Sequence, residues 1–168
     1  LHLCDRRQRQ MCIRDRLLLM NKDCSMKATV LYYSHKGKTA YLAREIAMYL
    51  WSKGVSVSLS AISDFDVAKL DETDFLLSGC WTCGWFVVGQ HPHRQWALSA
   101  RKMAGAVPPQ KLLFFTTYKF RTGGMFKRMK KVMGVPPSVP VSSLKSKTGR
   151  LTKEDKFVLD QFIGLSPN

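Results

Sequence analysis

The sequence predicts an α/β domain in which helices cover both faces of a doubly wound, five-stranded parallel sheet. Two observations favour this class. Short apolar runs alternate with segments of helical periodicity from residue 26 onward, as expected of consecutive strand–helix–strand units. The strongest run, Lys111–Thr117 (KLLFFTT), does not alternate with charged residues, which is typical of a strand buried on both faces. At 168 residues, 45% of them apolar, the chain is long enough for one such core.

In the first part of the chain the pattern predicts two strands around one helix. Ala28–Tyr33 (ATVLYY) is a short run of strand-forming residues, and Lys38–Ser52 has the period of a helix. The residues expected on the buried face of this helix are Leu42, Ile46, Tyr49 and Leu50. Gly54 ends the helix in the usual C-terminal position. Residues 55–59 alternate between apolar side chains and serine, which predicts a second strand nearer to the sheet edge.

The middle of the chain repeats this alternation. A turn or short helix around Asp66–Leu70 precedes a third strand over Asp74–Gly79. His93–Met103 follows as a second helix, and Lys111–Thr117 is the fourth strand. The residues expected on the buried face of that helix are Trp96, Ala100 and Met103.

The last part predicts a basic helix over Gly124–Met133, a fifth strand over Val139–Leu144 and a final helix. Thr152 is the expected N-cap of the final helix, which runs to Ile163. The apolar residues expected to face inward are Met125, Met129, Val132 and Met133 in the basic helix, and Phe157, Val158 and Phe162 in the final one.

The chain is strongly basic, with a formal net charge of +15. Residues 1–25 hold six basic and three acidic residues, a net +3, so +12 of the +15 belongs to the rest. We interpret residues 1–25 as a non-native or disordered basic extension and residues 26–168 as the domain. No stretch approaches the roughly 18 apolar residues of a membrane span, and no export signal is visible. We therefore expect a cytoplasmic protein whose surface attracts anionic partners.

The loop Ser34-His35-Lys36-Gly37-Lys38-Thr39 joins the first strand to the first helix and is the best candidate for an anion site. In a doubly wound sheet, ligands bind beyond the carboxyl ends of the strands, where helix N-termini present free N–H groups. The hydroxyls of Ser34 and Thr39 and the ammonium groups of the two lysines suit a phosphate. The loop has neither Walker nor dinucleotide-binding glycine spacing.

Met26–Ala43 (MKATVLYYSHKGKTAYLA) resembles the start of a flavodoxin, whose first loop runs Ser/Thr-x-Thr-Gly-x-Thr. Ser34, Gly37 and Thr39 match this pattern, whereas Lys36 replaces a hydroxyl residue and Lys38 a common Asn. The resemblance extends to about Ile163. It implies a flavodoxin-like three-layer sandwich with strand order 2-1-3-4-5, and a bound flavin mononucleotide (FMN).

In flavodoxins the loop after the third strand borders the flavin ring, and the resemblance assigns that role to residues 79–85. They are Gly79, Cys80, Trp81, Thr82, Cys83, Gly84 and Trp85. Trp81 or Trp85 is expected to stack on the ring. The Cys-x-x-Cys of this loop leaves two alternatives open, a zinc site completed by His91 and His93 and a redox-active dithiol. Ordinary buried or flavin-lining thiols are favoured over both, because the His-x-His spacing is not that of a zinc finger and residues 83–90 do not start a helix.

The resemblance places a second aromatic ring in the loop after the fourth strand. Its candidate flavin contacts are Thr116, Thr117, Tyr118 and Phe120, with Tyr118 the first choice for stacking. Lys119 and Arg121 stand where flavodoxins commonly carry acidic residues. A basic surround predicts a less negative reduction potential than that of acidic flavodoxins.

The resemblance implies an FMN-binding electron-transfer protein, and the basic surface implies an acidic redox partner protein. A small FMN-dependent oxidoreductase acting on a quinone or tetrapyrrole is the alternative. A second alternative is a flavin-less interaction domain of the same fold, suggested by the basic run Phe126–Lys131 (FKRMKK). No nucleic-acid recognition motif accompanies that run, so nucleic acid is the less favoured partner. No catalytic side-chain set and no metal site is expected.

Overall fold

The computed structural model describes residues 26–85 and 88–164. The predicted extension at residues 1–25 therefore lies outside the described part of the chain. Within the described residues, no helix is long and apolar enough to cross a membrane.

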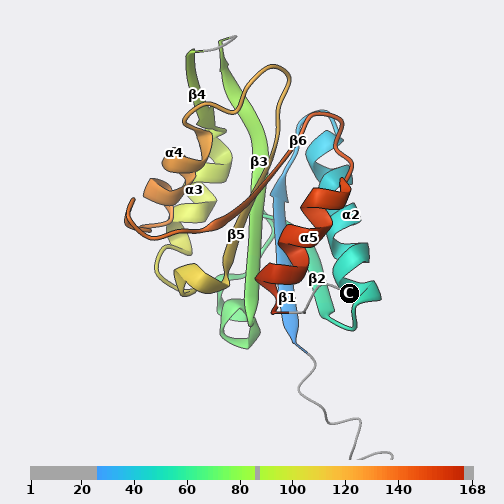
Figure 1. Ribbon diagram of the computed structural model, residues 1–168. Coiled ribbons are helices and arrows are strands. Elements are labelled where there is room, and N and C mark those ends of the chain that lie inside the picture. The colour runs from blue at the N-terminus through green and yellow to red at the C-terminus, as the bar shows by residue number, and fades with distance from the viewer. Residues whose placement is uncertain (1–25, 86–87, 165–168) are drawn as a thin grey trace, which may run out of the picture.

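A sheet of five parallel strands forms the centre of the molecule, in the order β2-β1-β3-β5-β6 (Figure 1). The strands are β1 (Lys27–Tyr33), β2 (Ser56–Ala61), β3 (Phe75–Trp85), β5 (Leu112–Thr117) and β6 (Ser142–Ser146). Counted along the chain without the antiparallel β4, this is the predicted order 2-1-3-4-5. The prediction of a doubly wound, flavodoxin-like sheet is confirmed.

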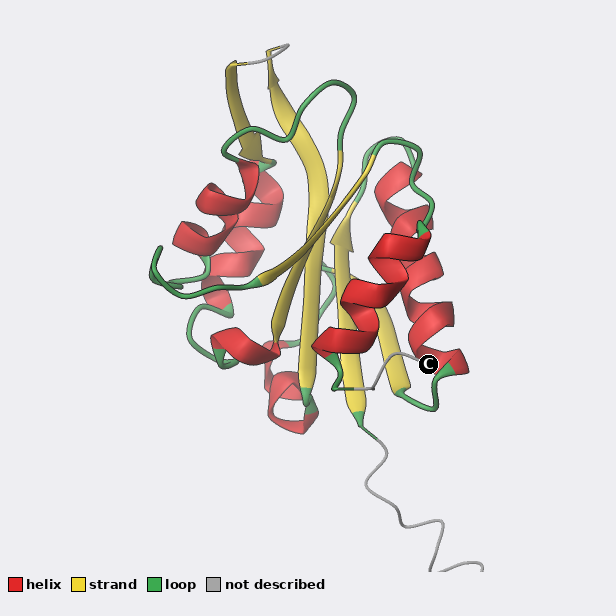
Figure 2. Cartoon of the chain, viewed as in Figure 1, coloured by secondary structure: helices red, strands yellow, loops and turns green. Residues whose placement is uncertain are grey.

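Helices cover both faces of the sheet, so the molecule has three layers (Figure 2). The helices are α2 (Lys38–Ser52), α3 (Arg94–Lys102), α4 (Met125–Val132) and α5 (Lys153–Phe162), with short 3₁₀ turns η1 (Val67–Glu72) and η2 (Pro109–Lys111). Helices α2 and α5 pack on one face, and α3 and α4 on the other. Alternate residues of each central strand supply the two cores: Phe114 faces α3, whereas Leu113 and Phe115 belong to the core under α2 and α5.

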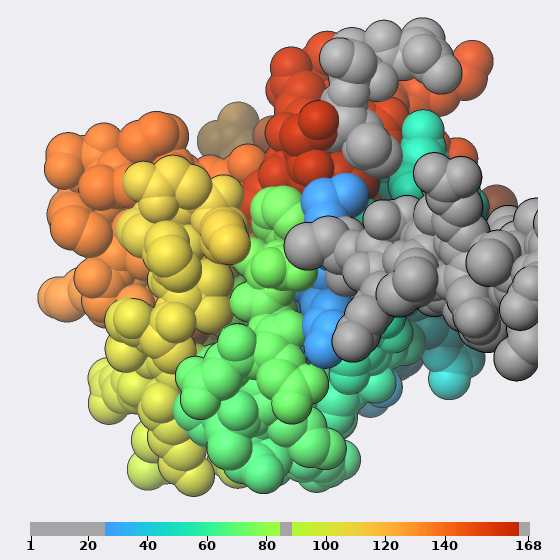
Figure 3. All heavy atoms as spheres, turned by 90° about the horizontal axis from the view of Figure 1, so that it is seen from below, coloured from blue at the N-terminus to red at the C-terminus, as the bar shows by residue number. Residues whose placement is uncertain are grey.

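The two ends of the sheet differ in what lies against them. All five parallel strands point their carboxyl ends toward the same edge, which is the upper edge in Figure 1. Figure 3 views the opposite end, where the segment around η1 (green) lies beside the start of β1 (blue). A buried Leu70 anchors η1 in the core there.

Two predicted elements differ from the structure. The third strand does not end at Gly79 but continues to Trp85, and it pairs antiparallel with the additional strand β4 (Val88–Pro92). The fifth strand lies a few residues later than predicted, at Ser142–Ser146.

The predicted buried faces of the helices are correct with few exceptions. Trp96, Ala100 and Met103 are buried, as are Met125, Met129 and Met133. Val132 and Tyr49 are half-buried. Phe157 was assigned to the wrong face of α5: its side chain is 46% exposed, and Leu159 occupies the core position instead.

Candidate functional site

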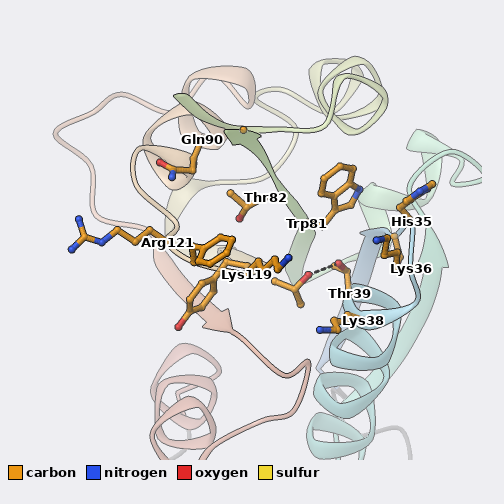
Figure 4. Close-up of a pocket in the computed structure, with 14 residues that line it drawn as sticks. His35, Lys36, Lys38, Thr39, Trp81, Thr82, Gln90, Lys119 and Arg121 are labelled. Atoms are coloured by element: carbon orange, nitrogen blue, oxygen red, sulfur yellow. Dashed lines mark hydrogen bonds between the residues drawn. The ribbon is translucent and has the colours of Figure 1, made fainter. Parts of the chain in front are cut away.

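A cavity of about 610 Å³ opens at the carboxyl edge of the sheet, where the loops after β1 and β5 face the extended end of β3 (Figure 4). This volume suits a cofactor-sized ligand. The lining residues come from these two loops, with the adjoining ends of α2 and β5, and from the β3–β4 hairpin: Ser34, His35, Lys36, Lys38, Thr39, Trp81, Thr82, Gly84, Gln90, Thr117, Tyr118, Lys119, Phe120 and Arg121. No carboxylate lines the cavity among these described residues.

The N-terminus of α2 forms one wall. Gly37 is the N-cap and has φ = 80°, a left-handed conformation that glycine adopts without a Cβ clash. No side chain caps the helix, and its first turn holds no acidic residue. The backbone N–H groups of this turn therefore remain available to an anion, and the helix dipole adds to the attraction.

Two buried polar groups beside this helix end have no hydrogen-bond partner within the described chain. They are Ser34 Oγ and Trp81 Nε1, and both residues line the cavity. By contrast, the buried Trp96 donates its Nε1–H to Ser78 Oγ at 3.1 Å. A buried donor without an acceptor destabilises a fold by about 1–3 kcal/mol, so a ligand oxygen at this position would remove a penalty.

Threonine hydroxyls join the strands beneath the cavity. Thr39 Oγ1 and Thr117 Oγ1 lie 2.7 Å apart, which ties the first turn of α2 to the end of β5. Thr82 and Thr116 pair at 3.0 Å, and Thr116 donates to the Cys80 carbonyl at 2.7 Å. These bonds fix the floor of the cavity because each joins two neighbouring elements.

The Trp81 ring lies near two imidazole rings. Its ring centroid lies 6.1 Å from that of His35 and 5.5 Å from that of His93. His93 also stacks on Tyr33 at 4.6 Å and accepts the Gln95 N–H at Nδ1, which caps α3. In Figure 4 the indole nitrogen is turned toward the loop of His35 and Lys36. The Trp81 N–H thus belongs to the same end of the cavity as the first loop.

The opposite wall is aromatic and basic. It consists of Tyr118, Lys119, Phe120 and Arg121, and Phe120 is 55% exposed. Lys119 Nζ lies 5.3 Å from the centroid of the Phe120 ring. Figure 4 shows the Lys119 side chain directed into the cavity and that of Arg121 directed away from it.

The structure brings most of the predicted site residues together. Ser34, His35, Lys36, Lys38, Thr39, Trp81, Thr82, Gly84, Thr117, Tyr118 and Phe120 line one cavity. Gly37 shapes the first loop without lining the cavity. The side chain of Trp85 lies outside the described residues.

Four predicted residues lie in or behind the sheet, namely Gly79, Cys80, Cys83 and Thr116. Gly79 pairs with Phe115 inside the parallel sheet, and a Cβ at this position would collide with the Phe115 ring. Its hydrogen atom is needed for strand packing, because β3 continues through this segment as a strand.

The two cysteines are buried free thiols. Burial raises the pKa of the Cys83 thiol to about 11. Burial also raises the pKa of the Cys80 thiol well above its ordinary value, and a hydrogen bond from the His93 backbone opposes this only in part. A reactive dithiol needs a lowered thiol pKa, so the redox-dithiol alternative finds no support. Among the described residues no group of three or more potential ligands can hold a metal, which leaves the zinc alternative without a site there.

Three lining residues are not among the predicted contacts, namely Lys119 and Arg121, which were expected only as basic surroundings, and Gln90, which was not expected at all. Gln90 is the informative case. It is buried on β4, and a Cβ on Gly123 would collide with its side-chain amide. The loop after β5 therefore rests directly on the hairpin. Only the antiparallel pairing of β3 with β4 brings Gln90 to the cavity, and no local sequence signal marks that pairing.

Neither a protein-family model nor a curated protein sequence matches the chain. Solved structures resemble its fold. The two-electron reduced flavodoxin of Megasphaera elsdenii is 18% identical with a TM-score of 0.61, over 82% of this chain and 98% of that one. Oxidised flavodoxin 2 of Bacillus cereus is 18% identical with a TM-score of 0.56, over 81% and 94%.

A larger protein contains the same fold. Rubredoxin oxygen:oxidoreductase of Desulfovibrio gigas is 15% identical with a TM-score of 0.60, and the similarity covers 94% of this chain but 39% of that one. Identities this low establish the fold and leave the ligand to be argued from the cavity. The chain has the flavodoxin-like fold.

Proposed function

We propose that the cavity binds FMN and that the protein is an electron carrier. The observation that supports this most directly is the pair of unpartnered buried donors, Ser34 Oγ and Trp81 Nε1, beside an uncapped helix N-terminus. A phosphate monoester supplies several acceptor oxygens and negative charge, which are the two properties that this wall lacks.

The residues present fit the rest of the cofactor as well. Tyr118 and Phe120 supply aromatic surface on the wall opposite to the phosphate end, and Thr82 and Gln90 supply polar groups between the two walls. Bound FMN supplies one- and two-electron chemistry. The protein's own residues hold the phosphate, orient the ring against the aromatic wall and set the electrostatic surround, with Lys119 directed into the cavity.

Titration of the purified protein with FMN tests the proposal, because a bound flavin loses its fluorescence when it lies against aromatic side chains. We expect saturable quenching that Lys36→Glu weakens, since this lysine lines the phosphate end of the cavity. Lys69→Glu is the matched control, because Lys69 is exposed on η1 at the opposite end of the sheet. Unquenched fluorescence would remove FMN from the proposal, and equal affinities of both variants would remove the phosphate cradle.

An FMN-dependent oxidoreductase is the second candidate, favoured by the basic rim of Lys119 and Arg121, which suits an anionic substrate. Stopped-flow measurements with NAD(P)H and a quinone separate the two functions. A carrier turns over negligibly without a separate reductase, whereas an enzyme consumes NAD(P)H in proportion to the quinone added.

A further inference from the structure

A second basic hollow lies along helix α4. It measures about 780 Å³ and is formed by the outer face of the helix and the loop that follows it. Its lining residues are Gly124, Lys127, Arg128, Lys130, Lys131, Gly134, Val135, Pro136 and Pro137. We call this surface the α4 groove. Four of these nine residues are cationic and none is acidic.

The cations of the α4 groove are not neutralised within the described chain. The ion pairs found there, Lys27–Glu72 and Lys53–Asp160, lie on other elements. Lys130 donates to the Val139 carbonyl at 2.9 Å, and Arg128 approaches the Gly89 carbonyl at 3.4 Å. These are contacts with neutral acceptors, so the positive charge of the groove remains.

The arrangement on α4 is unfavourable for an isolated helix. Met125 and Met129 bury the inner face, which leaves Lys127 and Lys131 exposed together, four residues apart. Like charges at this spacing destabilise a helix. Lys130 and Lys131 offset part of this because they lie in the last turn, where the helix dipole favours cations.

The α4 groove follows the cavity along the chain, and its Arg128 approaches the Gly89 carbonyl of the β3–β4 hairpin, whose Gln90 lines the cavity. Arg121 lines the cavity and points away from it, and Gly124, three residues later, is the first residue of the groove. Figure 1 shows the loop after β5 running from the upper edge of the sheet directly into α4. Phe120, which is largely exposed, adds an apolar contact at the same mouth. A basic rim beside an exposed aromatic residue is the composition of a protein docking surface.

We infer that the α4 groove, together with Phe120 and Arg121, is the docking surface for an electron-transfer protein with an acidic face. The redox part of this inference rests on the proposed function, whereas the docking part does not. A protein is favoured over a nucleic acid because the groove offers glycine, proline and valine beside its cations, and the sequence carries no nucleic-acid recognition motif. A partner seated here also covers the cavity mouth, through which electrons leave.

The test uses the full chain, isotopically labelled, with and without added FMN. The probes are an acidic ferredoxin, a basic cytochrome c and a short DNA duplex. We expect the ferredoxin alone to bind at low ionic strength, with amide shifts concentrated in residues 120–137. Lys127→Glu/Lys131→Glu should weaken this binding about tenfold, and binding should fade as salt is raised.

The control variant Lys69→Glu/Lys111→Glu carries the same change in charge on η1 and η2, at the amino end of the sheet. Its affinity should stay within about twofold of the parent. Equal weakening by both variants would mean that net charge attracts the probe without a docking surface, which overturns the inference. Tighter binding of the DNA duplex at the same residues also overturns it. Binding of ferredoxin by FMN-free protein separates failure of the docking surface from failure of the cofactor proposal.

Discussion

At the scale of single residues, the question is which part of Trp81 contacts the flavin: its N–H, bonded to the phosphate, or its ring, stacked on the flavin ring. Its N–H is buried without an acceptor and is turned toward the loop of His35 and Lys36, and its ring lies near the rings of His35 and His93. We expect Trp81→Phe to weaken FMN binding about tenfold, the effect of losing one hydrogen bond to a charged acceptor. The affinity for riboflavin, which lacks the phosphate, should fall by about twofold or less in the same variant. Fluorescence titration with both flavins measures this.

Trp51→Phe is the control for the Trp81 experiment, because the Trp51 side chain is 75% exposed and distant from the cavity lining. If Trp81→Phe weakens the binding of FMN and of riboflavin equally, the indole acts as a stacking surface, as the sequence predicts. The proposed bond from the Trp81 N–H to the phosphate is then wrong.

Lys119 and Arg121 form a natural pair for testing the electrostatics of the cavity. Lys119 extends into the cavity and Arg121 points out of it (Figure 4). A nearby positive charge favours the addition of an electron, so Lys119→Gln should lower the reduction potential of bound FMN by some tens of millivolts. Arg121→Gln should lower it by less. Redox titration of both variants measures the two shifts in potential. Equal shifts would contradict the different directions of the Lys119 and Arg121 side chains.

At the scale of elements, the pairing of β3 with β5 depends on Gly79. The Phe115 ring occupies the space that any side chain at this position would need. Overpacking of this kind destabilises a core by roughly 1–3 kcal/mol, which is the loss expected for Gly79→Ala in urea unfolding. Gly124→Ala is the control: a Cβ there meets no other atom, and the backbone has an ordinary negative φ. Equal stability of the two variants would show that β3 and β5 separate more easily than described.

Helices α2 and α5 are joined by the Tyr49 hydroxyl, which donates to the Asp160 carboxylate at 2.9 Å. Burial first, and then this bond, raises the pKa of Tyr49 above its ordinary value of 10.0. Because the folded-state pKa exceeds the unfolded one, the contribution to stability is complete below about pH 10 and is lost as the pH rises through the folded-state value. Tyr49→Phe should therefore destabilise the fold by about 1 kcal/mol at pH 8 and by less at pH 11.

Urea unfolding at the two pH values measures the Tyr49 effect. Tyr41→Phe is the control, since Tyr41 lies on the same helix with its side chain 46% exposed. A loss from Tyr49→Phe that does not change with pH would exclude the phenol as the titrating group.

At the scale of the whole molecule, local sequence patterns predicted most of the helices and strands. The features that they missed depend on contacts between segments that are distant in the sequence. Helix α2 has its predicted bounds because Gly37 and Gly54 mark both ends in the sequence. The β3–β4 hairpin was missed because residues 80–85 contain a glycine and no regular alternation, so only pairing across the turn reveals a strand. The buried face of α5 was predicted wrongly at Phe157 because this helix has apolar residues around much of its circumference. Only its packing against the sheet shows which of them are buried. The first loop was predictable, whereas Gln90 was not.

The charge of the whole domain leads to the last prediction. The chain beyond residue 25 carries +12, and neither the cavity nor the α4 groove is lined by a carboxylate among the described residues. Such a field concentrates anions and repels cations over about 10 Å at 0.1 M salt. Oxidation of the reduced, FMN-loaded protein by ferricyanide should slow as salt is raised, and oxidation by hexaammineruthenium(III) should accelerate. Stopped-flow rates over a salt series measure both slopes. Slopes of the same sign would mean that the acceptors reach the flavin without crossing the basic rim, and the cavity mouth would then not be the route of electron exit.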